Sequence, residues 1–132
     1  MRLIILIIFS INLIFPLSCF AALDYGKQSL LGTDFSGSDL QGATFYLTDL
    51  QDANLSNCDL QNASLYGAKL KDTNLEDSFA YSTQFENVKI QGADFTNVYL
   101  PRDVVREFCK DATGTNPFTN RETRETLECD YI

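Results

Sequence analysis

The 132-residue sequence contains no histidine, and this absence restricts the chemistry that the protein could perform. Histidine is the commonest general base, the commonest zinc ligand and the usual activator of a serine or cysteine nucleophile. The sequence also lacks a phosphate-binding glycine loop, a Cys-x-x-Cys pair and a calcium-loop pattern. We therefore expect no catalytic residues, no metal site and no cofactor, and we predict that the protein is not an enzyme.

Basic residues are scarce: ten Lys and Arg stand against 18 Asp and Glu, which gives a net charge of -8. Nucleic acid phosphates and anionic lipids are bound by clustered Lys and Arg, so the charge balance argues against nucleic acid as a partner. An acidic surface also keeps a protein in solution, which is the simplest interpretation of this charge.

The longest hydrophobic run lies near the start of the chain. Residues 3–17 are almost entirely apolar, follow Arg2 and precede small residues at positions 18, 21 and 22. This order is typical of a secretory signal peptide, so we predict that residues 1–22 are cleaved and that the mature protein is periplasmic or secreted. Two membrane-attached alternatives stay open: an uncleaved anchor formed by residues 3–22, and a lipid on Cys19.

The rest of the sequence repeats with a period of five residues, which fits neither an α-helix nor a regular β-strand. From residue 30 to residue 100, every fifth residue is large and apolar except Ala80. The residue two places before it is usually Ala, Ser, Thr or Cys, and the residue two places after it is often Gly or Asn, which favour turns. Two inward residues per unit define a very short strand, and the turn after each strand winds the chain into a coil.

The units at residues 53–57 (Ala-Asn-Leu-Ser-Asn), 63–67 (Ala-Ser-Leu-Tyr-Gly) and 93–97 (Ala-Asp-Phe-Thr-Asn) resemble the pentapeptide-repeat family. The resemblance extends over about residues 28–102. It implies an all-β fold, a right-handed quadrilateral β-helix in which four units make one coil and the large residues stack inside. Fifteen units would then make nearly four coils. We expect this β-helix to occupy residues 23–102.

Residues 103–132 are expected to form a short α-helical cap over the C-terminal end of the β-helix, because repeat arrays need their ends covered. Pro101 suits the first position of a helix. One face of that helix would carry Val104, Val105, Phe108 and Cys109. Thr119 and Glu122 have capping-box spacing for a second short helix that would end near Cys129.

The cysteines divide into a candidate pair and a single buried residue. Cys109 and Cys129 lie outside the repeats, and in an oxidising compartment they can form a disulfide that ties the cap together. Closing a loop of this length is worth ~3 kcal/mol in the chain-entropy treatment. Cys58 belongs to the small inward series, so we expect it to be buried and to serve packing.

Five large aromatic residues fall at outward positions of the coil. They are Tyr46, Tyr66, Phe79, Tyr81 and Tyr99. Outward aromatics are typical of contact surfaces, so these five form the candidate interaction surface, either for an unknown protein partner or for a homodimer. A structural alternative stays open, in which Phe79 turns inward to fill the space at Ala80 while Tyr81 and Tyr99 pack under the C-terminal helix.

These observations favour a non-catalytic exported scaffold that mediates protein-protein interaction. The resemblance implies a second function, because some acidic, dimeric pentapeptide-repeat proteins mimic DNA and bind type II topoisomerases. An exported chain, however, would not meet a cytoplasmic topoisomerase. A third hypothesis is a surface that binds a small ligand or a carbohydrate by stacking it on Tyr46 and Tyr66 or on the cluster around Phe79, although a convex column offers no obvious pocket.

Overall fold

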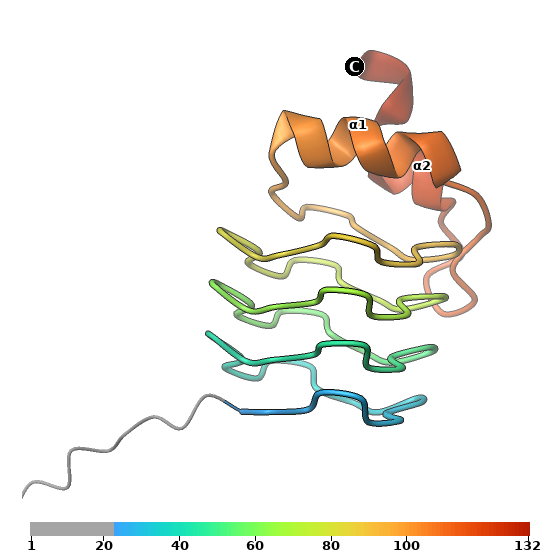
Figure 1. Cartoon of the computed structure of the whole chain (residues 1–132). Coiled ribbons are helices and arrows are strands. Elements are labelled where there is room, and N and C mark those ends of the chain that lie inside the picture. The colour runs from blue at the N-terminus through green and yellow to red at the C-terminus, as the bar shows by residue number, and fades with distance from the viewer. Residues whose placement is uncertain (1–22) are drawn as a thin grey trace, which may run out of the picture.

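The computed structural model describes residues 23–132, which form a β-helix with short helices above its last coil (Figure 1). The predicted signal peptide and the alternative lipid site at Cys19 lie outside the described residues. Within residues 23–132, no helix has the length and apolar character needed to cross a membrane.

Consecutive coils are joined by parallel bridges between residues 20 apart in the sequence, and these bridges extend over residues 24–94. At one of them, the Leu55 N–H donates to the Asn74 carbonyl at 2.7 Å, and the Asn74 N–H donates to the Ala53 carbonyl at 3.0 Å. A coil therefore contains four five-residue units. Each unit contributes a strand of minimal length, paired with the coils before and after it.

Every unit turns through a residue with positive φ, located two places after the large inward residue. This holds at all such positions from Lys27 to Asn97. Most of these residues are Gly, Asn or Asp, which tolerate the left-handed region best. The Asp or Asn side chain before the large residue also supports the turn, as where Asn54 Oδ1 accepts a hydrogen bond from the Ser56 N–H at 3.0 Å.

The large inward residues form a continuous core that is fully buried between Leu40 and Leu75. This core begins one unit earlier than the repeat counted from residue 30, because Tyr25 shares the same register. The Tyr25 ring stacks on Phe45 with centroids 5.0 Å apart, and it meets Phe35 edge-on at 5.5 Å. Aromatic contacts therefore take the place of aliphatic ones in the first coils.

The helix α1 (Arg102–Asp111) lies across the last coil and closes the core (Figure 1). Its Phe108 is buried, with ring centroids 5.6 Å from Phe85 and 5.3 Å from Phe95. Pro101 is the residue before the helix, not its first residue, so that detail of the prediction is wrong by one position. The extended backbone of Pro101 (ψ 147°) continues the strand geometry of the coil up to the helix.

A second short helix, α2 (Thr123–Thr126), is followed by the 3-10 helix η1 (Cys129–Tyr131). The predicted capping box is wrong, because Glu122 itself precedes the helix and no side chain caps it. The physical reason is an antiparallel bridge between Thr115 and Glu122, which holds Glu122 extended before α2 begins.

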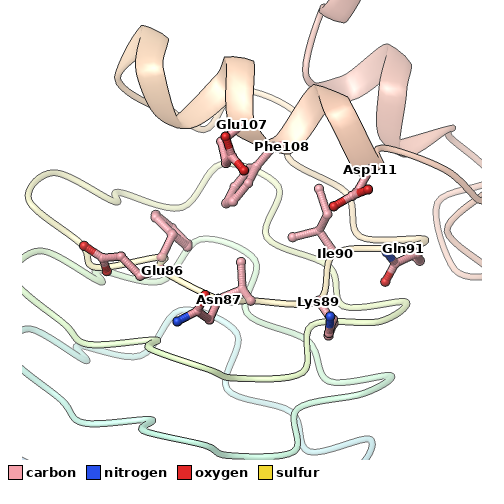
Figure 2. A pocket seen from close by; sticks show the side chains of 10 residues that line it. Glu86, Asn87, Lys89, Ile90, Gln91, Glu107, Phe108 and Asp111 are labelled. Atoms are coloured by element: carbon pink, nitrogen blue, oxygen red, sulfur yellow. The ribbon is translucent and has the colours of Figure 1, made fainter.

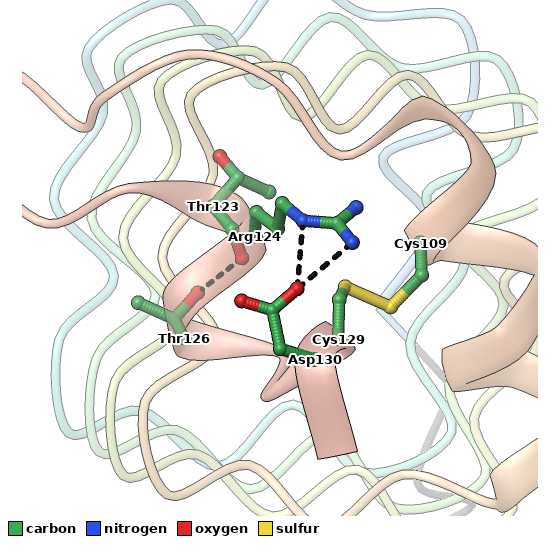
Figure 3. The surroundings of a disulfide bond; sticks show 6 residues. All are labelled: Cys109, Thr123, Arg124, Thr126, Cys129 and Asp130. Carbon is green, nitrogen blue, oxygen red and sulfur yellow. Dashed lines mark hydrogen bonds and ion pairs between the residues drawn. A yellow bond between two sulfur atoms is a disulfide. The ribbon is translucent and has the colours of Figure 1, made fainter. Parts of the chain in front are cut away.

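A disulfide between Cys109 and Cys129 joins α1 to η1, with their Cα atoms 5.6 Å apart (Figure 3). Next to it, Arg124 forms an ion pair with Asp130 at 2.9 Å, shown by the dashed lines in Figure 3. These links lie entirely within the cap. Other contacts must therefore hold the cap on the β-helix.

The C-terminal segment supplies hydrogen-bond partners to the last coil, whose strands have no further coil above them. The Thr113 carbonyl accepts from the Gly92 N–H at 2.8 Å, and Thr126 Oγ1 accepts from the Phe95 N–H at 3.1 Å. Asn116 is completely buried and donates through Nδ2 to the carbonyls of Thr73 (3.2 Å) and Gly92 (3.0 Å). The cap therefore satisfies part of the open edge of the β-helix as well as covering its core.

We predict that Asn116→Ala lowers the free energy of unfolding by about 2–3 kcal/mol, because the buried Gly92 carbonyl loses its donor and the Thr73 carbonyl keeps only the Asp94 N–H. Urea denaturation followed by circular dichroism measures this. Gln84→Ala, at an exposed outward position, is the control and should change stability by less than about 0.5 kcal/mol. Equal effects of the two substitutions would contradict the role assigned to Asn116.

A second prediction compares two glycines that both have positive φ. A Cβ on Gly42 (φ 67°) would meet no atom within 4 Å, whereas a Cβ on Gly114 (φ 87°) would lie 2.9 Å from the backbone nitrogen of Gly92. Gly42→Ala should cost about 1 kcal/mol for the left-handed backbone alone. Gly114→Ala should cost about 2 kcal/mol or more, because backbone must move. Thermal unfolding of both variants tests this, and a Gly114→Ala melting temperature equal to that of Gly42→Ala would contradict it.

Candidate interaction surface

All five aromatic residues singled out in the sequence point outward. Phe79, Tyr81 and Tyr99 are 67%, 67% and 74% exposed, and Tyr46 and Tyr66 are each 39% exposed. The alternative in which Phe79 fills the space at Ala80, with Tyr81 and Tyr99 packed under the helix, is therefore wrong.

The backbone explains why Phe79 stays outward although the neighbouring large residue is missing. The Phe79 N–H donates to the Cys58 carbonyl at 2.9 Å, and the Phe79 carbonyl accepts from the Leu60 N–H at 2.7 Å. Phe79 is thus bridged in register to Asp59, and a strand residue in register cannot turn its side chain to the other side. The space at position 80 is left to Ala80, which is itself buried.

Tyr46 and Tyr66 form a self-contained pair on another side of the coil. Their rings stack with centroids 5.6 Å apart and an interplanar angle of 17°. The Lys27 ammonium lies 5.9 Å from the centroid of the Tyr46 ring, and the Asn87 amide donates to the Tyr66 hydroxyl at 3.0 Å. Much of the surface of this pair is therefore already used within the molecule.

The other three aromatics belong to one side of the column, which we call the aromatic face. From the first coil to the last, its outward residues are Asp39, Gln41, Asp59, Gln61, Phe79, Tyr81 and Tyr99. The rings of Phe79, Tyr81 and Tyr99 form no ring pair with another aromatic residue of the described chain. The aromatic face is thus the larger exposed apolar surface of the two.

The two aspartates of the aromatic face support their own turns. Asp39 Oδ1 accepts from the Gln41 N–H, and Asp59 Oδ1 accepts from the Gln61 N–H, each at 3.1 Å. The Gln41 side-chain amide also donates to Asp59 Oδ2, which links the two units. This pair is accommodated by hydrogen bonds and has no arrangement for general acid or base chemistry.

A groove of about 260 Å³ lies between α1 and the last coil (Figure 2). Glu107, Phe108 and Asp111 line it from the helix, and Lys89 and Ile90 line it from the coil, as Figure 2 shows. Its charged side chains have both signs, and they bring together no nucleophile and base. Among residues 23–132, no group of three or more His, Cys, Asp or Glu side chains could hold a metal ion.

Cys58 is fully buried, and its thiol donates to the Phe35 carbonyl at 3.0 Å. Burial raises the pKa of the Cys58 thiol above its ordinary value. A thiol that stays protonated is a poor nucleophile, so Cys58 acts in packing.

An ion pair between the cap and the coil was not anticipated from the sequence. Arg121 contacts buried Asp94 at 3.1 Å and Glu76 at 2.9 Å. Burial alone would raise the pKa of Asp94, but hydrogen bonds from the Thr96 N–H and hydroxyl and the charge of Arg121 outweigh it and lower the pKa below its ordinary value. Asp94 and Arg121 are 27 residues apart, so no local pattern pairs them.

A model of pentapeptide repeats matches the chain in eight copies, over residues 28–62, 43–77 and 63–100. The thylakoid lumenal protein TL20.3 of the Arabidopsis thaliana chloroplast is 46% identical over 41 residues, which is 31% of this chain and 15% of that protein. The chain thus matches only a small part of the length of that relative.

Two solved structures are similar as well. A pentapeptide repeat protein from the Arabidopsis thaliana thylakoid lumen is 35% identical, with 83% of this chain and 86% of that chain covered and a TM-score of 0.42. The pentapeptide repeat protein Rfr23 of the cyanobacterium Cyanothece 51142 is 27% identical, with 61% and 52% covered and a TM-score of 0.52.

The lowered pKa of Asp94 predicts how acid affects stability. The Asp94 carboxylate binds a proton more weakly in the folded state than in the unfolded state. Ionised Asp94 therefore adds to the free energy of unfolding above the ordinary pKa of 3.8, and this addition is lost as the pH falls through the lower pKa of the folded state. Asp94→Asn should therefore reduce the melting temperature at pH 7 and reduce it less at pH 3. Asp39→Asn is the control, because Asp39 holds the same place in another repeat unit but is exposed. A difference between wild type and Asp94→Asn that does not shrink on acidification would contradict this assignment.

Proposed function

Because this chain belongs to the pentapeptide-repeat family, whose members are generally structural or interaction proteins, we propose that it is a non-catalytic exported scaffold that binds a protein partner. The observation that carries the proposal is the aromatic face. Phe79, Tyr81 and Tyr99 are about two thirds or more exposed on an acidic protein, and they lie side by side in the repeat register.

Exposed aromatic residues suit the centre of a protein interface. They bury a large apolar area with few rotatable bonds, and they are enriched among the residues that contribute most to binding. The backbone at Phe79 is hydrogen-bonded to the preceding coil, so it is already ordered before a partner arrives. Binding to such a surface loses little conformational entropy.

Three observations support a location outside the cytoplasm. The apolar run at residues 3–17 has the order of a signal peptide. The disulfide between Cys109 and Cys129 suits an oxidising compartment. Two similar proteins carry the thylakoid lumen in their names. We accordingly assign residues 1–22 to export, residues 23–102 to the β-helix and residues 103–132 to the cap.

The alternative functions have less support. Carbohydrate binding by Tyr46 and Tyr66 is disfavoured because these rings stack on each other. The cluster around Phe79 is exposed, but it lies on a convex surface, whereas small-ligand sites are concave. Mimicry of DNA toward a topoisomerase is supported by the net charge of -8 but conflicts with the predicted signal peptide.

Site-specific photo-crosslinking in the native host tests this function with the full-length protein. A photoreactive amino acid at position 81 should capture a discrete protein from the exported fraction, and the same amino acid at position 46 should not. The double variant Phe79→Ser and Tyr99→Ser should abolish capture from position 81, whereas Tyr46→Ser with Tyr66→Ser should leave it unchanged. The same capture from both positions, or none from position 81, would refute the proposal.

A further inference from the structure

The last coil keeps one stretch of strand edge without hydrogen-bond partners on its side toward the cap. In the coil before it, the Leu65 N–H donates to the Gln84 carbonyl at 2.8 Å. The N–H groups of Phe85 and Asn87, which face the cap in the same way, have no acceptor among residues 23–132. The Thr83 carbonyl likewise has no donor there. Three backbone groups along one strand are therefore unpaired.

This open edge follows from the place where the repeat ends. Bridges join residues 20 apart, so Gln84 would have paired with Val104 had the repeat continued. Val104 instead belongs to α1, whose backbone groups point along the helix axis. The cap supplies partners only farther along the coil, at Gly92 and Phe95. Residues 83–91 therefore keep an unpaired edge, which is a template for another strand.

The unpaired edge borders the groove between the last coil and α1. Two adjoining hollows of about 260 and 390 Å³ make up this groove, and the consecutive residues 85–91 line the first of them (Figure 2). Thr83 and Phe85 line the second, together with Val104 and Phe108 of α1. Space for an extended backbone is thus present beside the groups that lack partners.

The charge of the groove favours a basic occupant. Its charged lining residues are four acids and one base: Glu86, Asp103, Glu107, Asp111 and Lys89. Of these four carboxylates, only Glu107 forms an ion pair among residues 23–132, with Lys110. Lys or Arg side chains of an occupant would therefore find acidic partners that are still free.

The repeat register assigns a position to each residue of an added strand. Alternate residues would pair with the edge through their N–H and C=O groups, and their side chains would point outward. One paired residue would lie above Gln84 and the next above Glu86. Vertical neighbours of opposite charge do pair in this column, since Lys69 lies 3.3 Å from Asp49 in the coil before it. A Lys or Arg above Glu86 would repeat this arrangement.

We propose that residues 83–87 bind an extended, basic peptide segment of another protein, which adds as a parallel strand in the groove beside α1. The peptide donates an N–H to the Thr83 carbonyl and accepts from the N–H groups of Phe85 and Asn87. Its outward Lys or Arg side chain lies beside Glu86. Main-chain pairing supplies the affinity and the acidic lining supplies the selectivity.

A blocked heptapeptide of alternating lysine and threonine is the probe, because threonine favours an extended backbone and lysine supplies the charge. Fluorescence anisotropy of the labelled peptide, with the protein isolated from its native host, should give a Kd of about 1 mM or tighter. A glutamate-threonine peptide of the same length should bind at least tenfold more weakly. No binding of the lysine peptide at 1 mM, or equal binding of the two peptides, would overturn the proposal.

Backbone methylation of the probe separates strand pairing from simple charge attraction. Methyl groups on the lysine backbone nitrogens remove the N–H groups that face the edge, and they should weaken binding at least tenfold. Methyl groups on the threonine nitrogens, which face away from the edge, should leave the Kd within about threefold. Equal effects of the two methylation patterns would refute strand addition.

A charge reversal in the groove tests the acidic lining. Glu86→Lys should weaken binding of the lysine peptide at least threefold, and Lys71 shows that lysine is accepted at this position of a unit. Glu125→Lys, at an exposed position of the cap, changes the net charge equally and should leave the Kd unchanged. Circular dichroism melting verifies that both variants fold. Equal weakening by both substitutions would show that net charge alone attracts the peptide, and would overturn the site.

Amide hydrogen exchange measured by NMR locates the bound peptide. The N–H groups of Phe85 and Asn87 should exchange at least tenfold more slowly with saturating peptide, because each gains an acceptor. The N–H groups of Leu65 and Gly67, one coil lower and already paired, are the control and should not change. Binding that leaves exchange at Phe85 and Asn87 unaltered would overturn this inference. It would not affect the binding role proposed for the aromatic face, which belongs to another side of the column.

Discussion

Hydrogen bonds between residues about 20 apart keep each unit of this protein in a fixed register with the coils before and after it. The bond from the Leu55 N–H to the Asn74 carbonyl is typical of the series. Because strand side chains alternate between two sides, a fixed register determines which residues are buried and which are exposed. The buried core, the left-handed turns and the aromatic face are all consequences of this one constraint.

The same constraint explains how the column ends. A coil satisfies the edge of the coil before it, so the last coil needs partners that are not another coil. Thr113, Asn116 and Thr126 supply some of them from the C-terminal segment, and Phe108 covers the core. The cap is therefore part of the hydrogen-bonded structure of the β-helix, and its disulfide stabilises the cap internally.

The five-residue period was sufficient to predict the inward and outward residues, the turn positions and the exposure of Tyr46 and Tyr66, because each depends on residues within one unit. Contacts between distant residues could not be predicted in this way. Asn116 supports a local turn through its Oδ1, but its Nδ2 is also a buried donor to two coils, which nothing in the nearby sequence indicates. The pairing of Arg121 with Asp94 and the orientation of Phe79 at the Ala80 unit likewise depend on neighbours 20 or more residues away.

Four units per coil also constrain how such a chain can change length during evolution. An insertion of 20 residues adds a whole coil and leaves every later residue on its original side of the column. An insertion of five residues, after Gln61 for example, would preserve the inward pattern but move Phe79 and Tyr99 to the adjacent side, away from Asp39 and Asp59. Gene duplications that preserve the fold would therefore preserve the composition of a face only when they occur in complete coils.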